Sequence, residues 1–70
     1  MMPLTFADER EEKEIVRLAG TKEVRQHLAD LGFSVGSKIT VVSKVGQNMI
    51  VKVKGASIAL SKELANKIMV

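Results

Sequence analysis

The segment from Leu28 to Gly36 joins the end of a helix to the start of a strand, and it limits the fold more than any other stretch. Its spacing predicts that Leu31 ends the helix and that Gly32 follows in the left-handed conformation. Phe33 would then fold back onto Leu28, and Gly36 would supply the positive φ of a tight turn. The segment therefore sets the angle between a short helix and the strands that follow, and it carries no catalytic group.

Length and composition limit the class of protein. We expect one domain spanning residues 1–70, because 70 residues leave no room for a second. The absence of cysteine excludes disulfides and thiolate metal sites and fits a reducing cytosol. Only Phe6 and Phe33 are aromatic, so aliphatic side chains must fill the core. No apolar run approaches the roughly 20 residues of a membrane span, and residues 1–7 lack the basic start of a signal peptide. We therefore expect a cytoplasmic protein without membrane insertion.

The first half of the chain predicts an apolar clasp, a strand and a helix. The strand is expected over Glu14–Ala19, where β-branched residues precede a glycine. The helix is expected after Thr21, whose side chain can cap it, with Glu23 in the first turn. The clasp consists of Leu4, Phe6 and Ala7. The apolar stripe of the helix consists of Val24, Leu28 and Leu31.

Two alternating runs, Ile39–Val45 and Met49–Lys54, predict antiparallel strands joined by a three-residue loop over Gly46–Asn48. In this register Val41 lies opposite Val53. A slip of one residue would scatter the apolar side chains over both faces, so the alternation supports the pairing. The predicted buried face carries Ile39, Val41, Met49, Val51 and Val53.

A third strand is expected after a two-residue turn at Gly55 and Ala56, with glycine first. This turn would pair Val53 with Ile58, and it keeps the apolar residues of the third strand on the same buried face. The outer face of the meander would then carry Thr40, Val42, Lys44, Ile50, Lys52, Lys54, Ser57 and Ala59.

The order of the elements predicts a mainly β fold. Ser61 can cap a single helical turn over Lys62–Asn66, and Lys67–Val70 would form a last strand tied into the sheet. Five short strands favour a small bent sheet that closes on itself, because closure leaves few open edges. We predict a small SH3-like barrel with one short helix after the first strand and a helical turn before the last strand. A partly open OB-like barrel is the second candidate.

The chain offers little catalytic chemistry. His27 is the only histidine, and no nucleophile, base and orienting group are assembled, so we expect no enzyme and no catalytic residue. His27 with Glu23 could supply two metal ligands, but a real site needs three or four. The acidic run over Asp8–Glu14 is typical of a solvated connection. No glycine spacing matches a phosphate-binding loop, so we expect neither a cofactor nor a metal site.

Nucleic-acid binding is the main alternative, because the charges after Leu31 are almost all lysines. Small barrels often bind RNA or DNA, yet base stacking needs exposed aromatic side chains, and the predicted outer face has none. Lysine alone gives salt-sensitive, unspecific attraction. We therefore expect no stable nucleic-acid binding and keep a small basic nucleic-acid-binding barrel as the alternative.

The chain contains a series of short pieces in this order: Met2-Pro3-Leu4, Ile15-Val16-x-Leu18-x-Gly20, Leu28-x-x-Leu31-Gly32-Phe33-x-x-Gly36, Ile39-x-Val41-Val42, Asn48-x-Ile50-Val51-x-Val53-x-Gly55, Ile58-Ala59-Leu60 and Ala65-x-x-Ile68-x-Val70. In this order they resemble the FeoA family of ferrous-iron transport accessory proteins. Each piece is a turn or core signature, and the ordered set covers nearly the whole chain. Two positions depart from the family pattern: Val35 stands where many members have proline, and Arg10 where many have glycine.

The resemblance implies an SH3-like barrel and a cytoplasmic protein that works with FeoB, the membrane ferrous-iron transporter with a cytosolic GTP-binding domain. It implies no catalysis and supplies no catalytic residues. A direct iron-binding carrier is a third, weaker interpretation.

The register suggests where such a partner would bind. Val42, Ile50, Lys52 and Lys54 would lie together on the outer sheet face, with aliphatic residues at the centre and lysines around them. The end of the helix between Arg25 and Phe33 is the second candidate surface.

Overall fold

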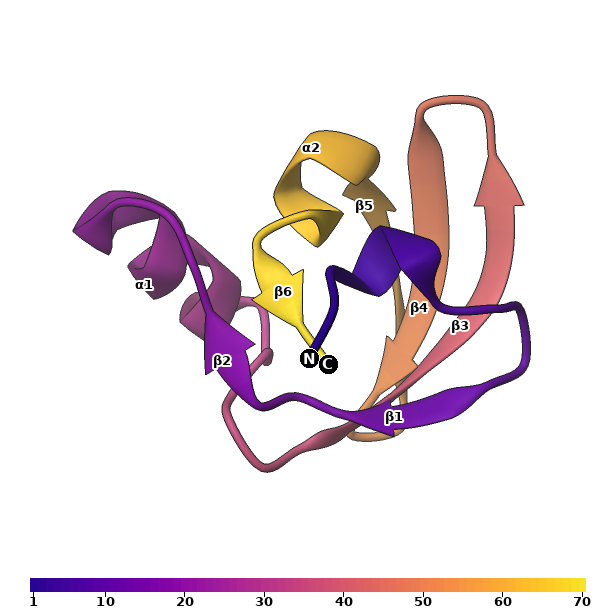
Figure 1. Ribbon diagram of the computed structural model, residues 1–70, viewed down its shortest axis with the longest axis horizontal. Helices are drawn as coiled ribbons and strands as arrows, with labels where there is room; N and C mark the ends of the chain where they lie inside the picture. The colour runs from indigo at the N-terminus through magenta and orange to yellow at the C-terminus, as the bar shows by residue number, and fades with distance from the viewer.

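The computed structural model describes residues 1–70 as six strands and three short helices arranged in two sheets. The larger sheet has the order β1-β3-β4-β5, and the smaller one pairs β2 with β6 (Figure 1). The sheets do not join into a continuous barrel, but they enclose one core, and the predicted mainly β, SH3-like fold is confirmed. The elements are η1 (Leu4–Phe6), β1 (Glu12–Glu14), β2 (Arg17–Leu18), α1 (Lys22–Asp30), β3 (Lys38–Val45), β4 (Asn48–Val53), β5 (Ala56–Ser61), α2 (Lys62–Ala65) and β6 (Ile68–Met69).

The core consists only of apolar side chains. All five residues predicted for the inner face of the meander are buried, and the rest of the core comes from every other part of the chain. None of the three helices is long and apolar enough to cross a membrane. The buried residues are Leu4, Ala7, Ile15, Leu28, Phe33, Ile39, Val41, Met49, Val51, Val53, Leu60, Ala65 and Ile68.

The end of α1 has the predicted geometry. Gly32 has φ +108°, and its N–H donates to the Ala29 carbonyl at 3.0 Å. The N–H of Phe33 donates to the Leu28 carbonyl at 3.0 Å. These two bonds form a Schellman motif, which directs the Phe33 side chain into the core beneath the helix. At the other end Thr21 Oγ1 accepts from the Val24 N–H at 3.2 Å, as predicted.

The first predicted strand, Glu14–Ala19, is divided between the two sheets. Glu12–Glu14 pairs with β3, and Arg17–Leu18 pairs with β6. Between them Ile15 is buried, and its carbonyl accepts from Gly36, so the chain turns from one sheet to the other. The clasp is also only partly as predicted, because Phe6 is 70% exposed.

The hairpin between β3 and β4 has a different register from the predicted one. Its turn has two residues, Gly46 and Gln47, and Val45 pairs with Asn48. A bulge between Val41 and Ser43 then restores the alternation, so that Val41 lies opposite Val51 instead of Val53. The correct residues are therefore buried with different partners.

The bulge also changes which residues share the outer face. Beyond it Lys44 pairs with the buried Met49 and so lies on the inner side, where its Nζ donates to the Thr5 carbonyl at 3.1 Å. The prediction that Lys44 lies on the outer face is wrong, because a two-residue turn reverses the alternation between the turn and the bulge.

The second hairpin turns at Lys54 and Gly55, and not at Gly55 and Ala56. Both turn residues have positive φ, +50° and +80°, as a type I′ turn requires. Val53 therefore pairs with Ala56, and Ile58 pairs with Val51. The predicted pairing was shifted by two residues, and a shift of two leaves each side chain on its predicted face.

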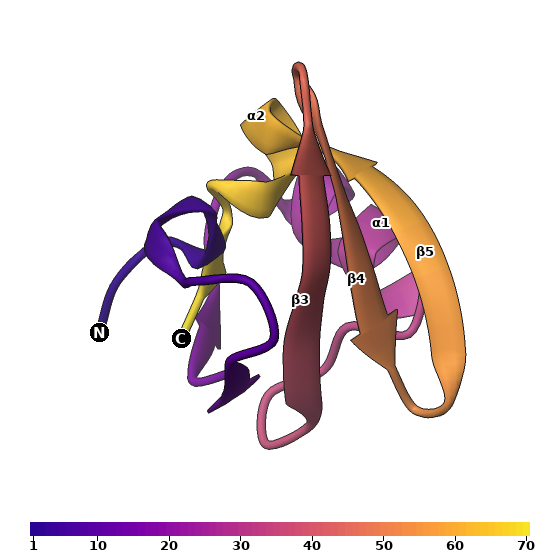
Figure 2. The same cartoon turned by 90° about the vertical axis from the view of Figure 1, so that its right-hand side faces the viewer.

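The C-terminal segment ties the two chain ends together. Ser61 Oγ accepts from the Leu64 N–H at 3.2 Å and caps α2, as predicted. The strand after it is shorter than predicted, Ile68–Met69, and pairs with β2. Met2 and Val70 exchange two backbone hydrogen bonds of 2.8 Å each, so the termini meet beside the smaller sheet (Figures 1 and 2).

Arg10 is the one non-glycine residue besides Lys54 with positive φ, +68°. Its N–H donates to the Val41 carbonyl at 2.6 Å, which fixes the connection before β1 against the edge of β3. Glycine adopts this conformation without strain, so a residue with a Cβ at this position has a conformational cost.

We predict that Gly32→Ala lowers the free energy of unfolding by about 1 kcal/mol or more, because a Cβ is strained at this φ. No atom lies within 4 Å of a Cβ built there, so the cost is conformational and not steric. Urea denaturation followed by circular dichroism measures the change. Gly32→Asn is the matched control and should lose less, since asparagine tolerates the left-handed region. Equal midpoints for Gly32→Ala and the parent protein would contradict the assigned helix end.

Val35→Pro should raise the free energy of unfolding by about 0.4–1 kcal/mol, because proline restricts the unfolded chain at a compatible position. The Ser37 N–H donates to Ser34 at 3.0 Å and Gly36 has φ +93°, as in a type II turn with Val35 at the position that favours proline. The Val35 N–H makes no hydrogen bond, so proline removes none. Thermal unfolding tests this, with Gly36→Ala as the control that should destabilise. A lower melting temperature for Val35→Pro would exclude this turn type.

Candidate functional site

Three of the four residues predicted for the outer sheet face lie on it. Val42 is 43% exposed in the bulge, Ile50 is half-buried, and Lys52 is exposed. Lys54 instead lies in the β4–β5 turn, so it borders this face without belonging to a strand. Neither Lys52 nor Lys54 forms an ion pair, since the two ion pairs of the chain are Lys13–Glu11 and Lys38–Glu14.

The second predicted surface, at the end of α1, divides into a buried and an exposed part. Phe33 is 0% exposed, so it cannot contact a partner, and this part of the prediction is wrong. The Schellman motif explains the difference, because it folds Phe33 under the helix. Arg25 is exposed, and its Nη1 donates to the Gly20 carbonyl at 3.2 Å, which holds the guanidinium near the start of the helix.

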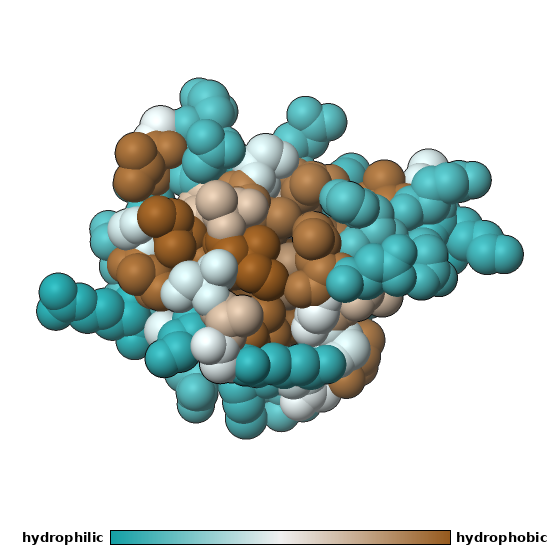
Figure 3. Space-filling model, turned by 180° about the vertical axis from the view of Figure 1, so that it is seen from behind, coloured by the Kyte–Doolittle hydropathy of each residue, from teal (hydrophilic) through white to brown (hydrophobic).

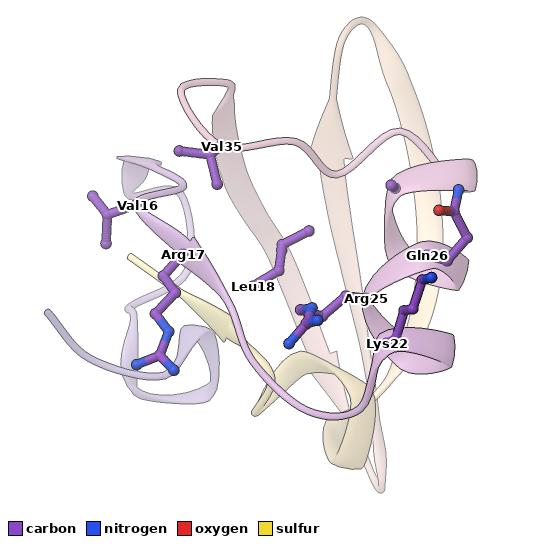
Figure 4. A pocket seen from close by; sticks show the side chains of 8 residues that line it. Val16, Arg17, Leu18, Lys22, Arg25, Gln26 and Val35 are labelled. Atoms are coloured by element: carbon purple, nitrogen blue, oxygen red, sulfur yellow. The ribbon is translucent and has the colours of Figure 1, made fainter.

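Arg25 lines a groove between β2 and α1 that the sequence did not reveal. The groove has a volume of about 430 Å³ and is open to solvent. In Figure 4 Leu18 points from β2 toward α1, and Arg25 points from α1 toward β2, whereas Arg17 extends away from the helix. The residues that line the groove are Val16, Arg17, Leu18, Lys22, Arg25, Gln26, Ala29 and Val35.

The groove is lined by apolar and positively charged residues and by no negatively charged one. Half of the lining residues are apolar, three are cationic, and none is acidic. Val35, which is 63% exposed, extends the apolar part onto the turn before β3. Such a surface can hold an aliphatic side chain between the walls while a neighbouring carboxylate meets Lys22 or Arg25. Figure 3 shows the molecule from behind the view of Figure 1. On this face, apolar side chains gather in the middle of the surface, and hydrophilic side chains lie on both sides of them.

The candidate metal ligands do not converge. His27 is exposed on the outer side of α1 near Glu23 and Asp30, and no group of three or more His, Cys, Asp or Glu side chains is placed to hold a metal ion. A site would also need one or two more ligands than His27 and Glu23 provide.

Two carboxylates of the acidic run, those of Glu11 and Glu14, are engaged within the chain. The Asp8 N–H donates to Glu11 Oε1 at 3.2 Å and lowers the pKa of the Glu11 carboxyl, with a further contribution from Lys13 at 3.4 Å. Glu14 pairs with Lys38 at 3.3 Å. These carboxylates therefore fix the connection to the strands instead of forming a cation cage.

Fold and groove together define a small SH3-like module whose exposed surfaces suit binding. Its backbone is similar to the crystal structure of an iron uptake regulatory protein, FeoA, with a TM-score of 0.89 and 29% identity over 97% of this chain and 90% of that one. The zinc complex of FeoA from Stenotrophomonas maltophilia, described as an SH3 domain protein, has a TM-score of 0.85 at 20% identity and covers 99% and 88% of the two chains. This second likeness concerns the fold alone.

The sequence agrees with the structural comparison. It matches the FeoA domain over residues 2–70. It is also 37% identical, over its whole length and 85% of the relative, to a candidate Fe(2+) transport protein A of Methanocaldococcus jannaschii. The chain therefore belongs to the FeoA family of ferrous-iron transport accessory proteins, as the resemblance implied.

We predict that the isolated chain binds Fe²⁺ no more tightly than about micromolar, because a micromolar site needs roughly 8 kcal/mol and the ligands here do not converge. Anaerobic calorimetry measures this, with His27→Ala as the control. A stoichiometric isotherm that His27→Ala abolishes would contradict the prediction and favour an iron carrier.

Proposed function

We propose that this protein is a cytoplasmic accessory component of ferrous-iron uptake that acts by binding the cytosolic part of a FeoB-type transporter. Membership of the FeoA family supports the role in ferrous-iron transport. Binding, and not catalysis, is the activity that the surface favours, because no nucleophile and base lie together and the exposed groove is apolar and cationic.

The observation that carries the proposal is the groove between β2 and α1. A partner that inserts an aliphatic side chain would bury it against Leu18, Ala29 and Val35, and an adjacent Asp or Glu would lie near Lys22 or Arg25. The groove is built on regular elements: Leu18 on β2 is paired with β6, and Ala29 lies within α1. Its walls are therefore in place before binding, which lowers the entropy lost in the complex.

Filling the groove should weaken binding to the purified cytosolic part of the transporter. We expect Ala29→Trp to raise the Kd at least tenfold, because an indole would occupy the space of the incoming side chain. Lys22→Glu should raise it about threefold to fivefold and reduce its salt dependence, since exposed ion pairs contribute up to about 1 kcal/mol. Calorimetry or interferometry at two salt concentrations gives both values.

His27→Trp is the matched control, because it places the same indole on α1 outside the groove. Ile50→Asp combined with Lys52→Glu tests the outer sheet face. If only this double variant weakens binding, the transporter contacts the sheet instead of the groove. If the parent protein does not bind the transporter and instead binds RNA with a steep salt dependence, the nucleic-acid alternative replaces the proposal.

A further inference from the structure

β5 is an uncovered edge of the larger sheet. The strand order β1-β3-β4-β5 places β1 at the other edge. That edge is short, three residues, and its sequence Glu12-Lys13-Glu14 is charged throughout, as in edges protected against pairing. β5 has six residues and contains neither a charged residue nor a proline. This edge thus lacks the usual protection and can accept another strand.

The backbone of β5 has hydrogen-bonding groups free for such a strand. The two-residue turn makes Val53 and Ala56 a hydrogen-bonded pair, and in an antiparallel ladder these pairs alternate with non-bonded ones. The N–H and C=O groups of Ser57 and Ala59 therefore point away from β4. Both residues are exposed, and neither makes a backbone hydrogen bond outside the ladder.

The side chains beside this edge indicate what an added strand would carry. Ser57 lies opposite Lys52, and Ala59 lies opposite Ile50, all on the outer face. Because Ser57 and Ala59 are small, the longer side chains behind them are reachable from the edge. Lys52 has no ion-pair partner in the chain, so an acidic residue placed across Ser57 would meet an unpaired cation.

On the inner side of the edge, Ile58 offers an apolar contact. It is half-buried and packs on the core, as Val24 of α1 does. β5 lies on the side of the molecule that Figure 3 faces, where apolar side chains fill the middle of the surface. A residue opposite Ile58 would be directed to this inner side and would gain from being apolar.

We propose that the β5 edge binds an extended, acidic segment of a protein partner as an added antiparallel strand. The segment would read, from its N-terminus, an apolar residue opposite Ala59, an apolar residue opposite Ile58 and an Asp or Glu opposite Ser57. Backbone bonds to Ser57 and Ala59 supply affinity, and Lys52 and Ile50 supply selectivity. A second copy of this chain fits less well, because each copy has a net charge of +3 and brings its own Lys52 to the same edge.

The test uses the full chain and an acetylated ten-residue peptide with Val-Val-Glu at its centre, flanked by Thr and Ser. Titration of the ¹⁵N-labelled protein should shift the amides of Ser57 and Ala59 most, and hydrogen exchange at both should slow at least tenfold at saturation. A peptide with Lys in place of the Glu should bind about fivefold more weakly.

Two variants separate the backbone from the charge. Lys52→Glu should reverse the preference, so that the lysine peptide binds more tightly than the glutamate peptide. Ser57→Pro removes an N–H that points away from β4 and breaks no hydrogen bond to β4. It should weaken binding of the glutamate peptide about tenfold. Ser57→Thr is the control, because it keeps the N–H. If Ser57→Pro does not fold, the charge reversal at Lys52 decides the question alone.

Three results would overturn the proposal. One is the absence of amide shifts at Ser57 and Ala59 with about 2 mM peptide, a concentration at which even millimolar binding is visible. Another is peptide-induced shifts confined to Leu18, Arg25 and Ala29, which would place acidic segments in the groove. The third is protection of Ser57 and Ala59 that grows with protein concentration without peptide, which would identify a second copy as the occupant. Because the probe is synthetic, none of these results depends on whether the transporter is the partner.

Discussion

The burial of Phe33 beneath the end of α1 is the contact on which the rest of the structure depends. It is the only aromatic side chain in the core, and Leu28 is the only fully buried residue of the helix above it. Burial of a phenylalanine stabilises a fold by roughly 3–5 kcal/mol against truncation, which is comparable to the whole stability of a domain of this size. The two backbone bonds around Gly32 fix where this side chain enters the core and how the chain leaves α1 toward β3. They thereby hold against the core the helix that supplies Gln26 and Ala29 to the groove.

The inner face of the sheet could be predicted from the sequence because side chains alternate between the two faces of a strand. A pairing that is wrong by two residues therefore leaves each side chain on its predicted face. The β4–β5 turn was placed one position late, which shifts the pairing by two and leaves Ile58 and Leu60 on their predicted face. The β3–β4 turn was predicted with three residues instead of two, which reverses the alternation. The bulge at Val42 reverses it again, so the residues between the turn and the bulge, such as Lys44, were placed on the wrong side. Neither a bulge nor the length of a short turn leaves a clear mark on hydrophobic periodicity.

The candidate surfaces were predictable only in part, for a related reason. Periodicity places a residue on a face of its own element, so Lys52 and Arg25 were correctly expected to be exposed. A groove depends on which elements lie beside each other, and the complete fold is needed to bring Leu18, which precedes α1, and Val35, which follows it, to one side of the helix. The edge position of β5 is likewise a property of the complete sheet order and not of its own six residues. The resemblance to a known family supplied the role in iron transport, but it named no contact surface.

The pairing of Met2 with Val70 has a mechanical consequence. Both backbone bonds between the chain ends join the same two residues, and β6 continues this pairing toward β2. A force applied across the two termini would therefore load these bonds one after another, from the chain ends inward, and would separate the strands of the small sheet in that order. Shear across a long ladder, which loads many bonds at once, does not occur in this geometry. Under such a force the pairing of the chain ends would be loaded before the larger sheet.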